Sequence, residues 1–277
     1  MSLDPRSIRI RIVPLDQVHL HEDFDPWRVK HLVSSLRRHL VLKNPIIVTE
    51  DGGRYVVLDG ATRAMALREM GIPHIVAQIV PYEEPTVRLS RWNHIVVGLR
   101  SPRLLAAIDR IPGLTSSSCS AEAMLCQLES RESIFGVLTD QGRCLAYFGD
   151  AEPKGKLGQL NEAVAAYRGK AEVHRAAELD IPALRSLYPD LSAVIAFPAF
   201  TPGEVLHFAL NEVKLPMGLT RHLINGRVLG TNVPLNALSG SETDLVQKNA
   251  WLEEMLQTRF RRNMVRVYEE PTIVLDE

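Results

Sequence analysis

A short polar segment, Asp59-Gly60-Ala61-Thr62-Arg63, follows an apolar run and precedes a helical pattern. Helix N-termini present free N–H groups and a partial positive charge, and they therefore bind phosphate. Gly60 lets a phosphate approach the backbone, Thr62 can donate a hydroxyl, and Arg63 offers a planar fork. Asp59 could hold a magnesium ion on that phosphate. The residues alone leave a second interpretation open, a strand–turn–helix corner with Asp59 as a plain N-cap.

A second group of chemically active residues lies between His19 and Asp25, in the loop that precedes a predicted helix. A carboxylate placed there could act as a general base toward a hydroxyl group. The alternative is that these are solvated loop charges. In either case Asp25 and Pro26 suit the N-cap and the first position of the helix.

The third group is Arg91-Trp92-Asn93-His94, which combines an aromatic face, an amide and an imidazole. It follows the last strand of the first predicted unit. A tryptophan packed in a domain interface, with ordinary neighbours, is the competing interpretation for Trp92 more than for His94.

The fourth group is the stretch Leu215–His222, which ends in Thr220-Arg221-His222 and is soon followed by Asn225-Gly226-Arg227. Adjacent Thr, Arg and His side chains in a loop that contains glycine suit an anion, either a phosphate or a carboxylate. A surface turn is the alternative.

The elements that must position the first two groups follow from hydrophobic periodicity and turn signals. The order is strand, helix, strand, tight turn, strand, loop, helix, strand, which predicts a compact α/β unit within residues 1–100. The expected strands are 8–13, 46–48, 55–58 and 74–80, and the expected helices run from Pro26 to Leu40 and from Ala61 to Met70.

The remaining residues, 101–277, predict a second mixed α/β domain that completes the site. A Pro-Gly-containing polar segment, Pro112–Ser118, is the best linker candidate. We expect a hairpin over 133–148, a strand over 193–197, helices over 103–111, 157–167, 202–213 and 244–260, an extended or looped stretch over 214–232, and an extended end over 265–275.

Bulk composition limits the class of protein. Lys and Arg number 32 and Asp and Glu 33, a net charge of −1, which lowers the expectation of nucleic acid as a partner. The three cysteines form no CxxC pair, so neither a zinc site nor a disulfide framework is expected. No apolar run is long enough to span a bilayer, and the N-terminus lacks the features of a signal peptide, which together predict a cytoplasmic protein.

The segment Val41–Val48, with the strand into Leu58-Asp59-Gly60 and a helix starting near Arg63, resembles the ParB/sulfiredoxin superfamily. The resemblance covers roughly residues 8–95 and implies a nucleotide-binding domain of that fold.

Within this superfamily the chain looks most like the free L-serine kinases, known as ADP-dependent enzymes in archaea and from siderophore biosynthesis in bacteria. Glu22 lies in the loop where those kinases keep a catalytic glutamate, although Asp23 or Asp25 could take that place. Trp92-Asn93-His94 and the stretch from Leu215-Pro216 to Thr220-Arg221-His222 resemble segments of their second domain.

The resemblance implies phosphoryl transfer from ATP or ADP to the hydroxyl of L-serine, giving O-phospho-L-serine. Glu22 would take the hydroxyl proton, and magnesium near Asp59 would bridge the phosphates. Phosphoryl transfer needs mostly positioning and charge neutralisation, which this inventory supplies. The nucleotide would be held by Gly60, Ala61, Thr62 and Arg63, and the amino acid by Trp92, Asn93, His94, Thr220, Arg221 and His222.

One departure stands out, because the archaeal kinases carry two histidines where this chain has Ala61 and Thr62.

Three other functions compete with the kinase function. Sulfiredoxin chemistry needs a cysteine in this loop and is disfavoured. A CTP-dependent, DNA-binding ParB protein would need a helix-turn-helix after the nucleotide domain. A regulatory protein would keep the phosphate loop without depending on Glu22.

Overall fold

The computed structural model describes residues 8–150, 152–240 and 245–268. Internal contacts divide the chain into two compact units that are discontinuous along the sequence. The first comprises Met1–Arg88, Ala209–Glu212 and Ile224–Glu277, and the second comprises Leu89–Phe208 and Val213–Leu223. A single domain boundary after residue 100 stays a prediction. What the structure adds is that the C-terminal residues group with the N-terminal ones.

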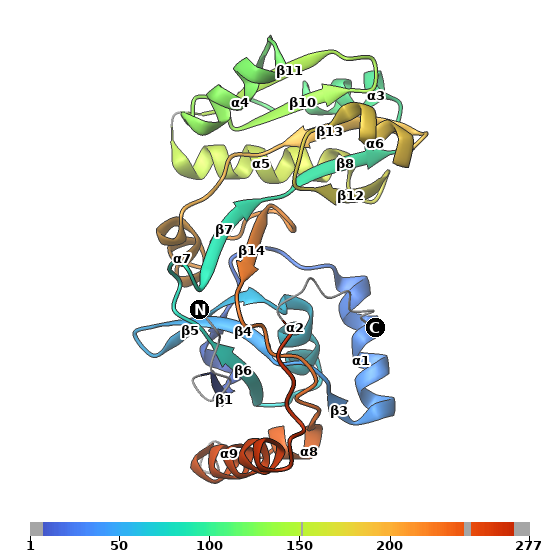
Figure 1. Ribbon diagram of the computed structural model, residues 1–277. Helices are drawn as coiled ribbons and strands as arrows, with labels where there is room; N and C mark the ends of the chain where they lie inside the picture. Colours follow the sequence, from blue (N-terminus) through green and yellow to red (C-terminus); the bar gives the residue numbers. More distant parts are fainter. Residues whose placement is uncertain (1–7, 151, 241–244, 269–277) are drawn as a thin grey trace. The chain divides into compact units, whose positions relative to one another are not determined.

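The first unit is built on a five-stranded sheet with the order β1-β6-β4-β5-β2. Strands β4 and β6 are parallel, as are β2 and β5, and the other neighbours are antiparallel. The predicted strands are confirmed here. Their bounds are Arg9–Pro14 for β1, Val18–His19 for β2, Ile46–Asp51 for β4, Arg54–Asp59 for β5 and His74–Ile79 for β6 (Figure 1).

Helices α1 (Pro26–His39) and α2 (Ala61–Glu69) pack in the main core of this unit. Helix α1 begins where the sequence predicted, since the Asp25 carboxylate accepts the backbone N–H of Trp27 at 2.9 Å and Pro26 takes the first helical position. The apolar side chains at helical spacing face inward, among them Val29, Val33 and Leu36.

The C-terminal part of the chain completes the first unit. Strand β15 (Val233–Pro234) pairs with β3 (Val41–Leu42), and α8 (Leu235–Leu238) and α9 (Leu245–Arg261) follow. Leu252 of α9 is buried in the same core as α1 and α2. The Asn249 amide also satisfies an edge residue of the sheet, because it accepts the Ile12 N–H and donates to the Ile12 carbonyl, both at 2.9 Å.

The second unit is a six-stranded sheet with the order β12-β8-β13-β10-β11-β9 and antiparallel neighbours throughout. The predicted hairpin and strand are present. The strand bounds are Asn93–Val97 for β8, Thr115–Ser118 for β9, Phe135–Thr139 for β10, Cys144–Phe148 for β11, Glu172–Ala176 for β12 and Leu191–Ala196 for β13.

Helices cover both faces of this second sheet. Residues of α3 (Ser101–Ile108) and α5 (Pro153–Tyr167) share one core, whereas α4 (Ala121–Glu129) and α6 (Ile181–Leu187) contribute to cores on the other side. Helix α7 (Pro202–Leu210) follows β13. Strands β7 (Val87–Arg91) and β14 (Thr220–Ile224) pair with each other as the chain passes between the units.

Several expectations are corrected. The segment Pro112–Ser118 is not a linker, because its second half is strand β9, which pairs with β11. The predicted helix over 202–213 ends at Leu210. Helix α4 was not predicted. Residues 265–268 form neither helix nor strand, and the rest of the expected extended end lies outside the described residues. In the described part of the chain, no helix has the length and apolarity that a membrane crossing requires.

Candidate functional site

The predicted phosphate loop lies between β5 and α2, as the sequence indicated. Gly60 adopts a left-handed conformation with φ of 101° at the N-cap position, which favours glycine over any other residue. A Cβ at this position would come within 2.7 Å of the Ile46 side chain. The loop therefore requires glycine for both conformation and space, and the first N–H groups of α2 follow directly.

Asp59 ends β5 and is paired with two arginines through one oxygen atom. Its Oδ2 accepts from Arg63 Nη2 at 2.7 Å and from Arg227 Nη1 at 3.2 Å. Arg63 also donates to the Pro45 carbonyl. Beside this group is a hollow of about 90 Å³, lined by Asn44, Pro45, Ile47, Asp59, Arg63, Arg227, Val228 and Leu229.

Glu22 follows the strand that runs parallel to β5. The pairs Val18–Tyr55 and His19–Val56 set the register, and continuing it takes Glu22 toward Asp59. A contact beyond the paired residues supports this placement, because the His21 ring lies 3.0 Å from the Val57 carbonyl. Both acids thus come at the carboxyl ends of neighbouring parallel strands, an edge where α/β sheets commonly bind ligands.

The surroundings of Glu22 are mostly buried. A carbonyl can only accept, so His21 Nδ1 carries the proton and Nε2 faces Glu22 Oε1 at 3.9 Å. Burial lowers the pKa of His21, although Glu22 and the Val57 carbonyl oppose that shift. The pKa of Tyr82 is raised by burial and then by the charge of Glu22. A carboxylate beside a neutral imidazole and a protonated phenol is suited to accept a proton.

In the second unit, the structure brings Trp92 and Arg221 together. The Arg221 guanidinium carbon lies 4.5 Å from the centre of the Trp92 ring, and the backbone N–H of Trp92 donates to the Leu219 carbonyl at 2.8 Å. Side chains alternate along β14, so Thr220 and His222 point to the face opposite Arg221.

His94 is inside the second unit and is 3% exposed. Its Nδ1 lies 2.7 Å from the Tyr167 hydroxyl and its Nε2 lies 3.1 Å from the Gly218 carbonyl. Burial, and secondarily Arg175 and Arg168, lowers the pKa of His94 to about 4 against the opposing bond to Gly218. His94 is therefore neutral, and both of its nitrogens are occupied by the protein.

Asn93 is also buried, at 1% exposure, and its Nδ2 donates to the Ala177 carbonyl at 3.3 Å. Within the described residues, its Oδ1 has no hydrogen-bond partner. The packing of Asn93 and His94 favours a role in holding neighbouring backbone over a direct contact with a ligand.

The donor set for a cation is small. Among the described residues, no group of three or more His, Cys, Asp or Glu side chains could hold a metal ion. Magnesium often uses only one or two carboxylates together with substrate phosphates and water, and Asp59 offers Oδ1, the oxygen that the two arginines do not contact.

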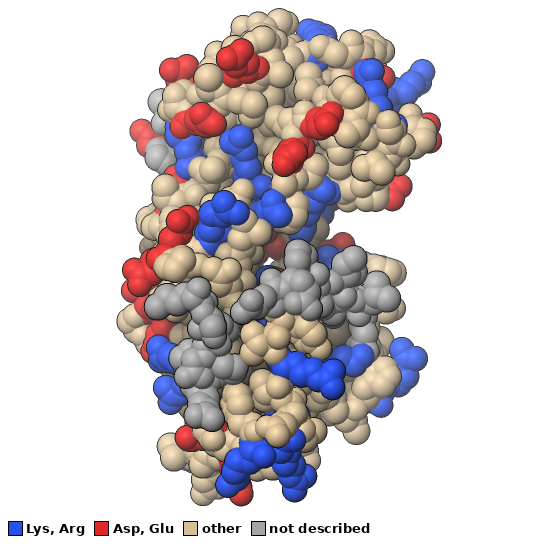
Figure 2. All heavy atoms as spheres, viewed as in Figure 1, with Lys and Arg blue, Asp and Glu red and all other residues tan. Residues whose placement is uncertain are grey.

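Lys and Arg side chains gather on the first unit over α9, and both signs of charge are mixed on the second (Figure 2).

Two residues of the first unit were not among the predicted site residues. Arg227 reaches Asp59 from a segment 168 residues later in the chain. Gln78, in the buried strand β6, is 2% exposed and hydrogen-bonds the backbone on both sides of Arg227. A polar residue inside a fully buried strand is a signal that the sequence contained.

Comparisons with known proteins agree with the motifs, although no family model matches the chain. The ATP-dependent L-serine kinase SbnI of Staphylococcus aureus is 28% identical over 273 residues, covering 97% of each chain. An ATP-dependent L-serine kinase of Staphylothermus marinus is 27% identical over 239 residues, covering 82% of this chain and 90% of the relative.

A solved structure of a free serine kinase in complex with AMP matches with a TM-score of 0.71, covering 83% of this chain and 94% of that one, at 16% identity. That likeness extends the agreement from sequence to fold. Over almost its whole length this chain is similar in sequence to ATP-dependent L-serine kinases, and it has the mixed α/β fold of a free serine kinase, as its motifs predicted.

Proposed function

We propose that this protein is an L-serine kinase that transfers the γ-phosphoryl group of ATP to the hydroxyl of free L-serine. The observation that carries the proposal is the joint placement of Glu22 and the phosphate loop at the ends of parallel strands β2 and β5. The two curated relatives described above, both named ATP-dependent L-serine kinases, support this choice of donor and acceptor.

In the proposed reaction, Glu22 takes the proton from the serine hydroxyl as that oxygen bonds to the γ-phosphorus. The bond between the γ-phosphorus and the β–γ bridging oxygen breaks, and ADP leaves. The N-terminus of α2 and the Arg63 guanidinium stabilise the charge on the phosphate oxygens. Asp59 would hold magnesium, which supplies charge neutralisation on the phosphates.

The amino acid is assigned to the second unit. Arg221, held by the Trp92 ring, offers a guanidinium for the serine carboxylate. Thr220 and His222 point to the other face of β14, so we do not assign them to the same serine molecule. His94 acts through Gly218, whose carbonyl it fixes. We propose a positioning role for His94 and Asn93, in place of the direct substrate contact that the resemblance implied.

The test is to incubate the purified protein with L-serine, magnesium and either ATP or ADP, and to measure O-phosphoserine by mass spectrometry. We expect product with ATP. Product with ADP alone would change the donor, and a lack of product with either donor would overturn the kinase proposal. We also propose a cytoplasmic location, as the sequence predicted.

A further inference from the structure

Asp59 holds its two arginines in different ways. Arg63 is 19% exposed and is fixed at two points, the Asp59 carboxylate and the Pro45 carbonyl. Arg227 is 39% exposed, and within the described residues Asp59 is its one ion-pair partner, at the longer distance of 3.2 Å. Both arginines contact the same oxygen, Oδ2. Arg63 is thus the permanent partner of Asp59, and Arg227 is the partner that can be exchanged.

The backbone that carries Arg227 is fixed to the sheet by a buried amide. Gln78 Nε2 donates to the Gly226 carbonyl at 2.8 Å, and Gln78 Oε1 accepts the Val228 N–H at 2.9 Å. The two bonds flank Arg227. A buried amide costs free energy unless both of its ends are hydrogen-bonded, and here the two flanking peptide groups are its partners.

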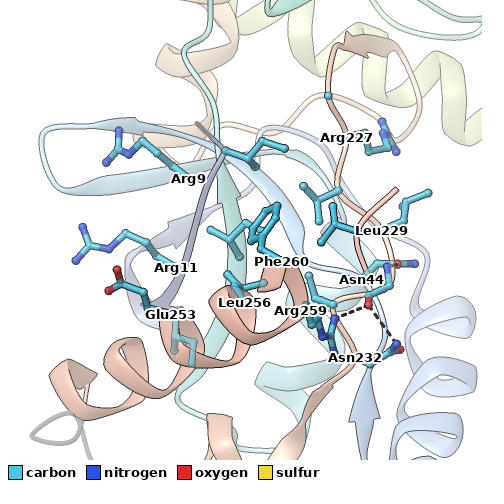
Figure 3. A pocket seen from close by; sticks show the side chains of 18 of the residues that line it. Arg9, Arg11, Asn44, Arg227, Leu229, Asn232, Glu253, Leu256, Arg259 and Phe260 are labelled. Carbon is cyan, nitrogen blue, oxygen red and sulfur yellow. Dashed lines mark hydrogen bonds between the residues drawn. The ribbon is translucent and has the colours of Figure 1, made fainter. Parts of the chain in front are cut away.

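The rest of this loop is anchored as well. Gly230 N–H donates to Asn44 Oδ1 at 2.8 Å, and the Gly230 carbonyl accepts from Arg259 at 3.0 Å and from Asn232 at 3.1 Å. Figure 3 shows Arg259 and Asn232 converging on that oxygen, with Arg227 at the other end of the loop. The loop backbone is therefore held at both ends, and the Arg227 side chain is the part that can move.

We propose that Arg227 is a phosphate-binding residue of the nucleotide site, that Asp59 is its counter-ion before the nucleotide binds, and that Gln78 is its positioning residue. This inference rests on the proposed kinase function. The hollow beside these residues is lined by two guanidinium groups and one carboxylate, a net positive lining that suits phosphate oxygens. Phosphate oxygens replace Asp59 Oδ2 as the partner of Arg227, while Asp59 keeps its bond to Arg63 and would offer Oδ1 to a cation.

The proposal is tested by ATP binding with EDTA present, measured by calorimetry on the full chain. Arg227→Gln is expected to weaken ATP binding about 10- to 100-fold, the range for a lost charge-assisted contact. Adenosine affinity is expected to stay within about twofold, because adenosine carries no phosphate. The ATP affinity of Arg227→Lys is expected to lie between those of the wild type and Arg227→Gln, since lysine keeps the charge and loses the planar fork.

Asp59 gives the sharper test. Without magnesium, Asp59→Asn removes the competitor for Arg227 and is expected to tighten ATP binding, a gain that disappears in the Asp59→Asn, Arg227→Gln double variant. Gln78→Met is expected to weaken ATP binding in the wild-type background and to have little further effect when Arg227 is Gln. A merely structural role for Gln78 would weaken binding equally in both backgrounds.

Arg131→Gln is the matched control, because Arg131 forms an ion pair of similar exposure with Glu204 in the second unit, at 2.9 Å. It is expected to bind ATP like the wild type. If wild-type protein binds ATP and Arg227→Gln binds it equally well, this inference is wrong while the kinase proposal stands. If the wild type binds no ATP with EDTA or with magnesium present, both this inference and the ATP-dependent kinase proposal are wrong.

Discussion

The guanidinium of Arg221 lies over the indole ring of Trp92, with 4.5 Å between its central carbon and the ring centre. Such a contact fixes the direction of the fork, and it contributes about 0.5–1 kcal/mol at a partly exposed site. Residues 129 positions apart in the sequence thereby form one surface of the second unit. The contact orients the guanidinium of a long side chain.

Replacing Arg221 by Met tests this role, because the variant keeps the length of the side chain and loses its charge. We expect the KM for L-serine to rise about tenfold, while the affinity for ATP stays unchanged. Steady-state kinetics at varied serine concentration makes the measurement. Arg131→Gln is again the control, since Arg131 also lies over an aromatic ring, Phe200, at 5.2 Å. An equal rise of KM in both variants would remove the special role of Arg221.

Glu22→Gln separates catalysis from binding. The variant cannot take the hydroxyl proton, so we expect kcat to fall by about 10²- to 10⁴-fold, whereas ATP binding should change by less than about threefold. Asp23→Asn is the matched control, because Asp23 is an exposed neighbouring acid. Loss of turnover in Asp23→Asn with normal turnover in Glu22→Gln would move the base to the neighbouring position.

Gly60→Ala should damage the phosphate loop. The new methyl would meet Ile46 at 2.7 Å and sit at a φ of 101°, so we expect unfolding free energy to fall by about 1–3 kcal/mol and ATP binding to weaken. Gly53→Ala is the control, since Gly53 has a φ of 79° and no atom within 4 Å of the added Cβ. Urea unfolding of both variants should show the larger loss at Gly60.

The buried His94 predicts a stability change with pH. Its folded pKa of about 4 lies below the ordinary 6.5, so the unfolded chain binds the proton first as the pH falls. The neutral, buried His94 therefore contributes fully to the unfolding free energy above pH 6.5. That free energy falls between pH 6.5 and 4, by up to about 1.4 kcal/mol per pH unit. Urea unfolding at several pH values measures the slope. In His94→Gln the slope over this range should be smaller, and an unchanged slope would contradict the assignment.

The thiols should differ in reactivity. Burial, and then the neighbouring Cys119, raises the pKa of Cys144 to about 12, whereas Cys126 is exposed. At pH 8 only about one Cys144 in 10⁴ is a thiolate, so iodoacetamide should modify Cys126 first and reach Cys144 only after unfolding. Mass spectrometry of the alkylated protein gives the order. Rapid modification of Cys144 in the folded protein would show that its burial is incomplete.

The parts of the site that could be predicted are those with local causes. The helix start at Asp25-Pro26 and the loop at Gly60 follow from capping and from backbone geometry, which depend on a few adjacent residues. The motif at Glu22 was found by resemblance, and parallel pairing of β2 with β5 explains why it lies where it does.

The parts that could not be predicted depend on distant pairings. Nothing near Arg227 in the sequence indicates that it meets Asp59, and the buried contacts of His94 arise only when Tyr167 and Gly218 fold against it. Strand β9 looked like a linker because its residues, Thr115 to Ser118, are small and polar. Its pairing with β11 decides its conformation.

The return of the chain to the first unit at Ile224 has a consequence for synthesis on the ribosome. A nascent chain that has released only β1 to β6 lacks Arg227, α8 and α9. Domains generally fold as units during translation, and this unit must wait until the whole of the second one has been made. The two-arginine group around Asp59 is therefore completed late in synthesis, because Arg227 emerges only after the second unit.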